Sequence, residues 1–290
     1  MKKTLLKLLG KQRATPKRST TEEDATPPGP SPKGGRSGET VFSAEAMDPA
    51  LRFRSLTLSG ADQSVLSVDS DQQPAFKIRL AKSVGFRRDA RGLVGRRYND
   101  RGYLVPAATQ DPNLYSFLAY DEGNIVGTVS IRLDSERGLS ADQLYRAELD
   151  ELRGRGCMVC EFTRLAVDVK TASKPVLAGL FHTAYLYASA VRGYDYAVIE
   201  VNPRHVAFYR RALGFEPIGP ERVNTRVDAP AILLCVPFET IRKGVAEFGG
   251  KAEQAGNERS LFPFGFSTEE ERGILQRLHE LDAQRGTARK

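Results

Sequence analysis

The strongest constraint on the fold is a run of short apolar strands that alternate with amphipathic helices between about residues 74 and 240. Residues 115–133 hold two apolar runs around Asp-Glu-Gly-Asn, which is typical of a β-hairpin. Residues 175–191 place apolar side chains at i, i+3 and i+4 spacing, which predicts a helix. Further strands are predicted at 76–81, 157–168, 194–202 and 231–238, and further helices at 139–153 and 203–215. This order predicts a mixed α/β sheet.

Helix boundaries are predicted from capping residues and glycines. Ser140 is expected to cap the helix at 139–153, and Ser267 with Glu270 has the spacing of a capping box ahead of a C-terminal helix. A helix that starts near residue 83 is expected to break at Gly92, Gly95 and Gly102.

The N-terminal segment has a different composition. Residues 10–40 are rich in Pro, Gly, Ser, Thr and charge, and cannot offset the entropy cost of ordering. We therefore expect a disordered basic tail over residues 1–70, one domain over 71–240 and a helical extension over 241–290. Of the net charge of +7, residues 1–40 carry +5. The rest is nearly neutral, so nucleic-acid binding is not expected.

Three cysteines give no disulfide framework, and Cys157 with Cys160 lacks the further ligands that zinc requires. We expect buried thiols and no metal. No window approaches the ~18 consecutive apolar residues of a membrane-spanning helix, and the basic start is not followed by a signal cleavage site. We expect a cytoplasmic protein without stable membrane insertion.

The stretch AVIEVNPRHVAFYRRALGFEPIG, residues 197–219, resembles the C-terminal half of the GCN5-related N-acyltransferase (GNAT) fold. In that superfamily a strand ends in Asn, a short helix carries an aromatic pair, and a Leu-Gly-Phe turn follows. The matching residues here are Asn202, Phe208, Tyr209, Leu213, Gly214 and Phe215. The resemblance implies a mixed, mostly antiparallel central sheet flanked by helices, and acyl transfer to an amine.

A second pair of motifs narrows the resemblance. CEFTRLAVD, residues 160–168, resembles the Glu-x-x-Arg-x-x-Val motif of acyl-homoserine lactone synthases and of bacterial N-acyl amino acid synthases. VGTVSIRLDS, residues 126–135, resembles their Gly-x-x-x-x-Arg-Leu strand. The chain closely resembles the N-acyl amino acid synthase group over about residues 74–240. This implies fatty acyl transfer from an acyl carrier protein thioester to an amino acid, with acyl-phosphopantetheine as donor and no tightly bound cofactor.

Two departures from related enzymes bear on the substrates. VDVKTASKPVLAGL lacks the glycine-rich loop with which acetyl-CoA enzymes hold a pyrophosphate at a helix N-terminus. This favours a carrier-protein donor over CoA. YNDRGYLVPAATQD supplies Asp100 and Asp111 without the acidic spacing of the lactone synthases. A homoserine lactone product is therefore not expected.

Acyl transfer to an amine requires a base for the amine proton and donors for the oxyanion. Glu161 interrupts an apolar strand, where burial would raise its pKa toward that of a general base. A structural ion pair is the alternative. Arg132 and Arg164 are expected either to bind a substrate carboxylate or to hold such acids. Tyr209 lies near the acid tyrosine of the superfamily, although core packing explains it equally well.

Backbone and docking groups complete the predicted site. The N–H groups of Leu165, Ala166 and Val167 are expected to meet the thioester carbonyl, and Asn202 to contact substrate. An arginine cluster is expected to dock an acidic carrier protein, with a solvated helix face as the alternative. Its members are Arg87, Arg88, Arg91, Arg96, Arg97 and Arg101.

The leading functional prediction is thus an N-acyl amino acid synthase that uses acyl carrier protein. The alternatives are a GNAT-fold enzyme that transfers from acyl-CoA to another amine, and a non-catalytic acyl-binding or regulatory module. Charged residues inside apolar strands favour an enzyme, because a binding module has little reason to bury them.

Overall fold

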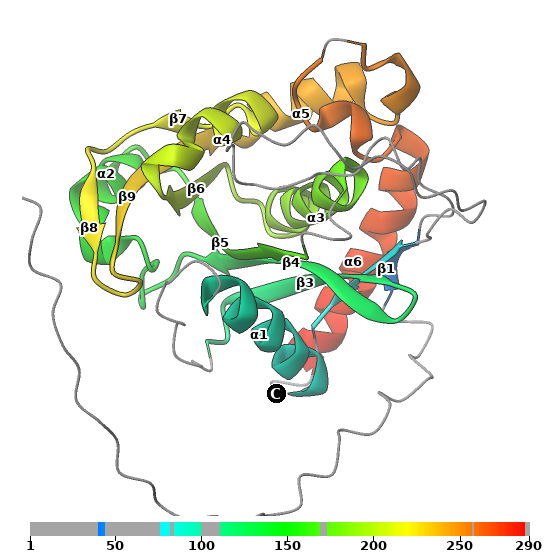
Figure 1. Ribbon diagram of the computed structural model, residues 1–290, viewed down its shortest axis with the longest axis horizontal. Helices are drawn as coiled ribbons and strands as arrows, with labels where there is room; N and C mark the ends of the chain where they lie inside the picture. The colour runs from blue at the N-terminus through cyan, green and yellow to red at the C-terminus, as the bar shows by residue number, and fades with distance from the viewer. Residues whose placement is uncertain are drawn as a thin grey trace, which may run out of the picture. The chain divides into compact units, whose positions relative to one another are not determined.

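The computed structural model describes residues 40–43, 76–81, 84–99, 111–168, 173–256 and 258–287 (Figure 1). The strands in these ranges are β1 (Thr40–Ser43), β2 (Phe76–Leu80), β3 (Leu114–Asp121), β4 (Asn124–Leu133), β5 (Val159–Val167), β6 (Tyr196–Val201), β7 (Glu216–Pro217), β8 (Arg222–Asn224) and β9 (Ala229–Pro237). The α-helices are α1 (Val84–Asn99), α2 (Asp142–Gly154), α3 (Lys174–Leu186), α4 (Val206–Leu213), α5 (Phe238–Phe248) and α6 (Thr268–Thr287). Single turns of other helix types are η3 (Tyr187–Val191), η4 (Pro203–His205), η5 (Ala252–Gln254) and η6 (Phe262–Phe264).

The strands form one mixed sheet in the order β1-β2-β3-β4-β5-β6-β9-β7, and β8 pairs with β9. Among the described strands, the pairing of β5 with β6 is parallel and the other pairings are antiparallel. The predicted mixed, mostly antiparallel sheet flanked by helices is confirmed.

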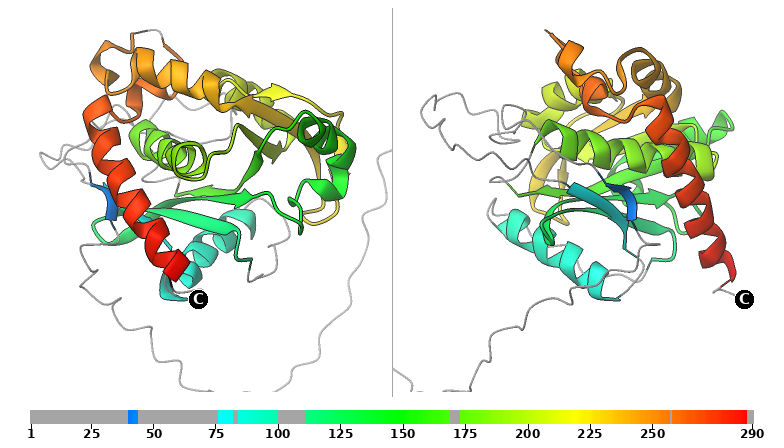
Figure 2. Two further views of the ribbon diagram at one scale, coloured as in Figure 1. Left: turned by 180° about the vertical axis from the view of Figure 1, so that it is seen from behind. Right: turned by 90° about the vertical axis from the view of Figure 1, so that its right-hand side faces the viewer.

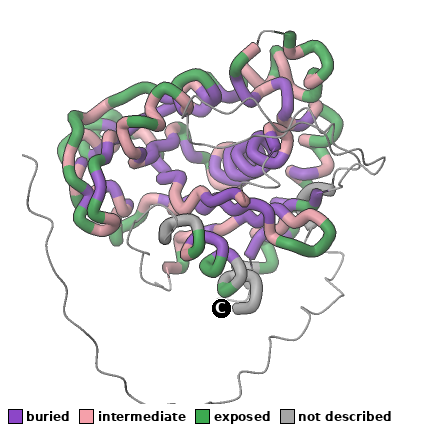
Figure 3. Tube along the Cα trace, in the orientation of Figure 1, coloured by how far each residue is buried: buried purple, intermediate pink, exposed green. Residues whose placement is uncertain are grey.

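Helices cover both faces of the sheet, and the two faces are called here the α2 face and the α3 face. Leu93 of α1 packs with Ala166 of β5, and Tyr145 of α2 packs with Val159 of β5, so α1 and α2 lie on the α2 face. The larger core lies on the α3 face, where α3, α4, α5 and α6 pack against the strands. Figure 2 shows α1 and α3 on opposite sides of the sheet, and Figure 3 shows that α3 is buried along its length.

Several boundary predictions are confirmed and others are wrong. Ser267 and Glu270 form the capping box at the start of α6, since each backbone N–H is bonded to the other residue's side chain. The helix α1 continues through Gly92 and Gly95, where a break was predicted, and the third predicted break, Gly102, lies outside the described residues. A glycine inside a helix costs only about 1 kcal/mol, which the packing of Leu93 on the sheet offsets.

The prediction of disorder over residues 1–70 is wrong at four positions. Thr40–Ser43 forms β1, which pairs with β2 at the edge of the sheet. The sequence Thr-Val-Phe has the β-branched and aromatic composition that strands favour, although it is flanked by residues typical of loops. The remainder of the predicted tail lies outside the described residues. Among the helices that the structure describes, none is both long and apolar enough to cross a membrane.

Candidate active site

The centre of the sheet opens between β5 and β6. These strands pair only where Val159–Glu161 lies beside Tyr196–Val198. Beyond Glu161, β5 continues along β4, whereas β6 continues along β9. The sheet therefore has an opening whose inner end lies at Glu161.

A β-bulge bends β5 directly beside this opening. The register with β4 shifts between Thr128 and Ser130, and Arg164 on β5 has a φ of 54°. This left-handed conformation is usually occupied by glycine in bulges and costs other residues of order 1–3 kcal/mol. Strained backbone that persists in a well-packed strand is typical of functional sites.

The bulge also directs backbone donors. The N–H of Asp168 donates to the carbonyl of Val126 on β4 at 2.8 Å. Because backbone groups alternate between the two edges of a strand, the N–H of Val167 points away from β4, toward the opening. The same alternation directs the N–H of Ala166 toward β4, where Ala166 lies opposite Thr128. Of the three predicted donors, Val167 is therefore the best placed, and Leu165 lies beside it on the bulge.

Glu161 is the acid at the inner end of the opening. Its side chain is only 2% exposed, and its Oε2 accepts a hydrogen bond from the backbone N–H of Ser140 at 2.6 Å. Burial, together with the negative charge of Glu200, raises the pKa of Glu161 to about 7, against the opposing effects of the Ser140 N–H and Arg132. A carboxyl group with this pKa exists in both protonation states near neutral pH, as a general base requires.

Ser140 and Arg132 support this carboxyl group. The predicted N-cap role of Ser140 is wrong, because α2 begins at Asp142 after Ala141, and the Ser140 backbone binds Glu161 instead. Arg132, opposite Glu161 on β4, donates from Nη1 to Ser140 Oγ. Its Nε forms an ion pair with Asp111 Oδ2 at 2.8 Å. Of the two interpretations of Arg132, the structure contains the one in which this arginine holds acidic side chains of the protein.

A second buried acid, Glu200, was missed by the sequence analysis. Val198 of β6 lies opposite Glu161, and Glu200 follows two residues later on the same face. The Glu200 side chain is 8% exposed, and its Oε2 is 2.5 Å from Nη2 of Arg226 and also accepts from Asn224. Burial raises its pKa, whereas Arg226 acts in the opposite direction. Its signal was available, because Glu200 also interrupts an apolar strand.

Two other predicted residues have structural partners. Tyr209 on α4 is buried, and its ring packs edge-on against Phe181 and Phe215 on the α3 face. Core packing, one of its two interpretations, is therefore present. Asn202 accepts a hydrogen bond from the N–H of Arg204 and thereby caps η4. Substrate contacts by these two residues stay predictions.

The predicted docking arginines fall mainly on α1. Arg88, Arg91 and Arg96 are exposed on this helix, which lies on the α2 face. Arg87 and Arg97 also belong to α1, but their side chains are outside the described part of the chain, as is all of Arg101. Docking stays a prediction.

The cysteines are free thiols. Cys160 and Cys235 are buried and Cys157 is half-buried, so the expectation of full burial is wrong for Cys157. In the ranges that the structure describes, no three His, Cys, Asp or Glu side chains come together as metal ligands would.

The comparisons with known proteins agree with this geometry. A family model described as N-acyl amino acid synthase FeeM matches residues 89–237. The structure of FeeM, an N-acyl amino acid synthase from uncultured soil microbes, is 30% identical, covering 59% of this chain and 94% of that one with a TM-score of 0.53. Comparison with curated protein sequences finds no match.

Other solved structures are similar at lower sequence identity. The acyl-homoserine lactone synthase LasI is 15% identical, with 56% of this chain and 89% of that one covered and a TM-score of 0.41. The CoA-dependent acyl-homoserine lactone synthase BjaI is 15% identical, with 55% of this chain and 77% of that one covered and a TM-score of 0.39.

The opened sheet, the bulge and the buried acid define a GNAT-fold N-acyltransferase. The family match covers half of the chain, and most of FeeM is aligned with it. The chain belongs to the FeeM family of N-acyl amino acid synthases.

Proposed function

We propose that this N-acyltransferase transfers a fatty acyl group from an acyl carrier protein thioester to the amine of an amino acid. The observation that carries the proposal is Glu161, a buried carboxyl group with a pKa of about 7 at the inner end of the sheet opening. The amino-acid acceptor is supported by membership of the FeeM family.

The reaction needs one proton acceptor and one set of oxyanion donors. Glu161 takes a proton from the ammonium group of the acceptor, directly or through a water molecule. The freed amine attacks the thioester carbonyl, so that a C–N bond forms. The C–S bond then breaks, and the proton that the nitrogen loses as the amide forms passes to the departing thiolate, which leaves as the pantetheine thiol. The oxyanion develops between these two steps. The backbone N–H of Val167 donates a hydrogen bond to it, and the backbone N–H of Leu165, also on the bulge, is the second donor.

The substrate carboxylate is assigned to Arg164. Arg164 belongs to the bulge, three residues beyond Glu161 on β5. Arg132 already pairs with Asp111, and we assign it to holding the acid cluster. An arginine that binds a carboxylate through two parallel hydrogen bonds cannot be replaced by lysine without loss. Arg164→Lys should therefore raise the KM for the amino acid more than it lowers kcat.

Donor choice is assigned to the exposed arginines of α1, which include Arg88, Arg91 and Arg96. They suit an acidic carrier protein, and the chain lacks the glycine-rich loop typical of CoA enzymes.

Purified full-length protein, supplied with a mixture of amino acids, should convert long-chain acyl carrier protein into N-acyl amino acids detectable by mass spectrometry. Rates with acetyl-CoA that equal or exceed those with the carrier thioester would overturn the assigned donor. Acylation of amines other than amino acids would overturn the assigned acceptor, and no acylation of any amine would favour a non-catalytic module.

A further inference from the structure

Glu200 has one carboxylate oxygen that the proposed reaction leaves unused. Asn224 Nδ2 and Arg226 Nη2 both donate to Oε2 of Glu200, Arg226 at 2.5 Å. Among the residues that the structure describes, the other oxygen, Oε1, is buried and has no hydrogen-bond partner. A buried acceptor without a donor costs free energy, so it indicates a position that a donor from a ligand fills.

The turn between β8 and β9 fixes the orientation of this carboxylate. Arg226 Nε donates to Asn224 Oδ1, so the guanidinium binds one oxygen of Glu200 instead of both in parallel. Because both donors bind Oε2, they hold the carboxylate with Oε1 directed away from the turn. They also favour the ionised form of Glu200, whereas burial raises its pKa.

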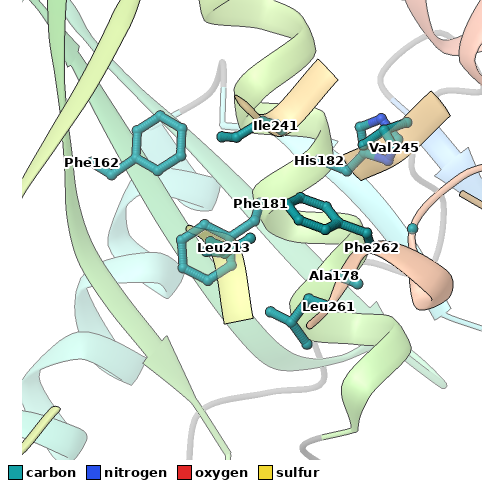
Figure 4. Close-up of a pocket in the computed structure, with 10 residues that line it drawn as sticks. Phe162, Ala178, Phe181, His182, Leu213, Ile241, Val245, Leu261 and Phe262 are labelled. Atoms are coloured by element: carbon teal, nitrogen blue, oxygen red, sulfur yellow. The ribbon is translucent and has the colours of Figure 1, made fainter. Parts of the chain in front are cut away.

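Glu161 and Glu200 flank the inner end of the sheet opening, one on β5 and the other on β6. Glu161 lies opposite Val198, the last residue of β6 that pairs with β5. Glu200 is two residues further along β6 and therefore lies on the same face as Glu161, at a diagonal spacing that long side chains can span. The next residue on β5, Phe162, points to the other face, into an apolar pocket against α3 (Figure 4).

The repulsion between the two carboxylates favours a cation between them. The negative charge of Glu200 raises the pKa of Glu161. Arg132 is already paired with Asp111, and Arg226 binds Glu200 from the side of the turn. A positive group with N–H donors, placed between the acids, relieves the repulsion. The α-ammonium group of an amino acid has this charge and carries three donors.

We propose that Glu200 Oε1 binds the α-ammonium group of the acceptor and holds its nitrogen beside Glu161. The proposal rests on the proposed transfer to an amino acid. One N–H proton of the ammonium group passes to Glu161, while a second N–H stays hydrogen-bonded to Glu200. The lone pair that the first proton leaves on the nitrogen is thereby held in one orientation for attack on the thioester carbon.

The test compares amino acids with acids that lack only the amino group, by calorimetry on the full-length protein at neutral pH. The pairs are L-alanine with propanoate, L-phenylalanine with phenylpropanoate, and L-glutamate with glutarate. The amino-acid preference is the Kd of the acid without the amino group divided by the Kd of the amino acid. In Glu200→Gln the amide oxygen keeps Asn224 and Arg226, so an NH2 group replaces Oε1 and cannot accept from the ammonium group. The preference should therefore fall by roughly 10–100-fold for each amino acid that binds the wild type.

Two further variants complete the test. Glu148→Gln is the matched control, because Glu148 is a half-buried acid on the α2 face whose two oxygens both accept from Arg222, at 3.1 and 2.7 Å. It should leave the preference unchanged. Glu200→Asp keeps the charge but withdraws both oxygens by one methylene, so the preference should fall here too. This variant carries the test if Glu200→Gln does not fold.

The outcomes separate this proposal from the proposed function. If the Glu200 variants weaken both members of a pair equally or change neither, Glu200 only holds the turn and the proposal is wrong. It is also wrong if no amino acid binds the wild type more tightly than its partner acid. If Glu200→Gln removes the preference but the wild type acylates no amine, the ammonium site stands and the proposed function fails. If the wild type acylates amino acids and Glu200→Gln keeps the preference, the proposed function stands and the ammonium site fails.

Discussion

Replacement of Glu200 by Gln should change the pH dependence of the reaction without removing its base. The pKa of Glu161 is raised from 4.5 to about 7 by burial first and by the charge of Glu200 second. Glu200→Gln removes the second cause and keeps an oxygen for Arg226 and Asn224. The pKa of Glu161 should therefore fall but stay above 4.5, because its burial remains. We expect a decrease on the order of one unit, equivalent to about 1.4 kcal/mol.

The assay is kcat/KM for the amino acid as a function of pH. A base must be ionised, so kcat/KM in the wild type should decrease tenfold per unit below about pH 7. In Glu200→Gln this acid limb should begin at lower pH, with the plateau rate reduced because a weaker base accepts the proton. Glu239→Gln is the control, since Glu239 is an exposed acid on α5 with its own arginine partner. An acid limb that stays in place or moves to higher pH in folded Glu200→Gln would refute the coupling of the two acids.

Four further predictions concern the remaining parts of the site. Glu161→Gln should lower kcat by roughly 10²–10⁴-fold in folded protein, the usual contribution of a general base, and a rate per folded molecule equal to wild type would contradict this role. Since the folded pKa of Glu161 lies above its unfolded value, the free energy of unfolding should fall by up to about 3 kcal/mol as pH rises from 4.5 to about 7, and denaturant titrations should show a smaller fall in Glu161→Gln. The free energy of unfolding of Arg164→Gly, from denaturant titration, should exceed that of Arg164→Ala by about 1 kcal/mol, because glycine adopts a φ of 54° without strain. Equal free energies of unfolding would show that the bulge relaxes. Charge reversal of Arg88, Arg91 and Arg96 should raise the KM for acyl carrier protein at low salt and change it little at high salt. Charge reversal of Arg272, which is exposed on α6, is the control and should leave this KM unchanged.

Local patterns in the sequence predict most of the sheet and the burial of Glu161. Alternation and helical spacing depend on near neighbours, which the sequence shows directly. The hydrogen bond between Ser140 and Glu161 joins residues that are 21 positions apart, and no local rule separates it from helix capping. Glu161 lies near Glu200 because β5 pairs with β6 in a particular register. The two strands are separated in the sequence by α3, so local patterns do not show this register.

The packing of the residues beyond 237 on α3 could not be predicted from the sequence for a related reason. One of the contacts between them is the hydrogen bond from the Phe266 backbone N–H to His182. A histidine on the apolar stripe of a helix gives no indication of which segment it will bind. The bulge at Arg164 was equally hidden, because its position is normally marked by glycine.

The short pairing of β5 with β6 has a mechanical consequence. It divides the sheet into two halves, one carrying Glu161 and the other carrying Glu200, joined at this seam by only three residue pairs. The repulsion between the two carboxylates depends on their separation. A change in the angle between the half-sheets would therefore change the affinity of Glu161 for its proton.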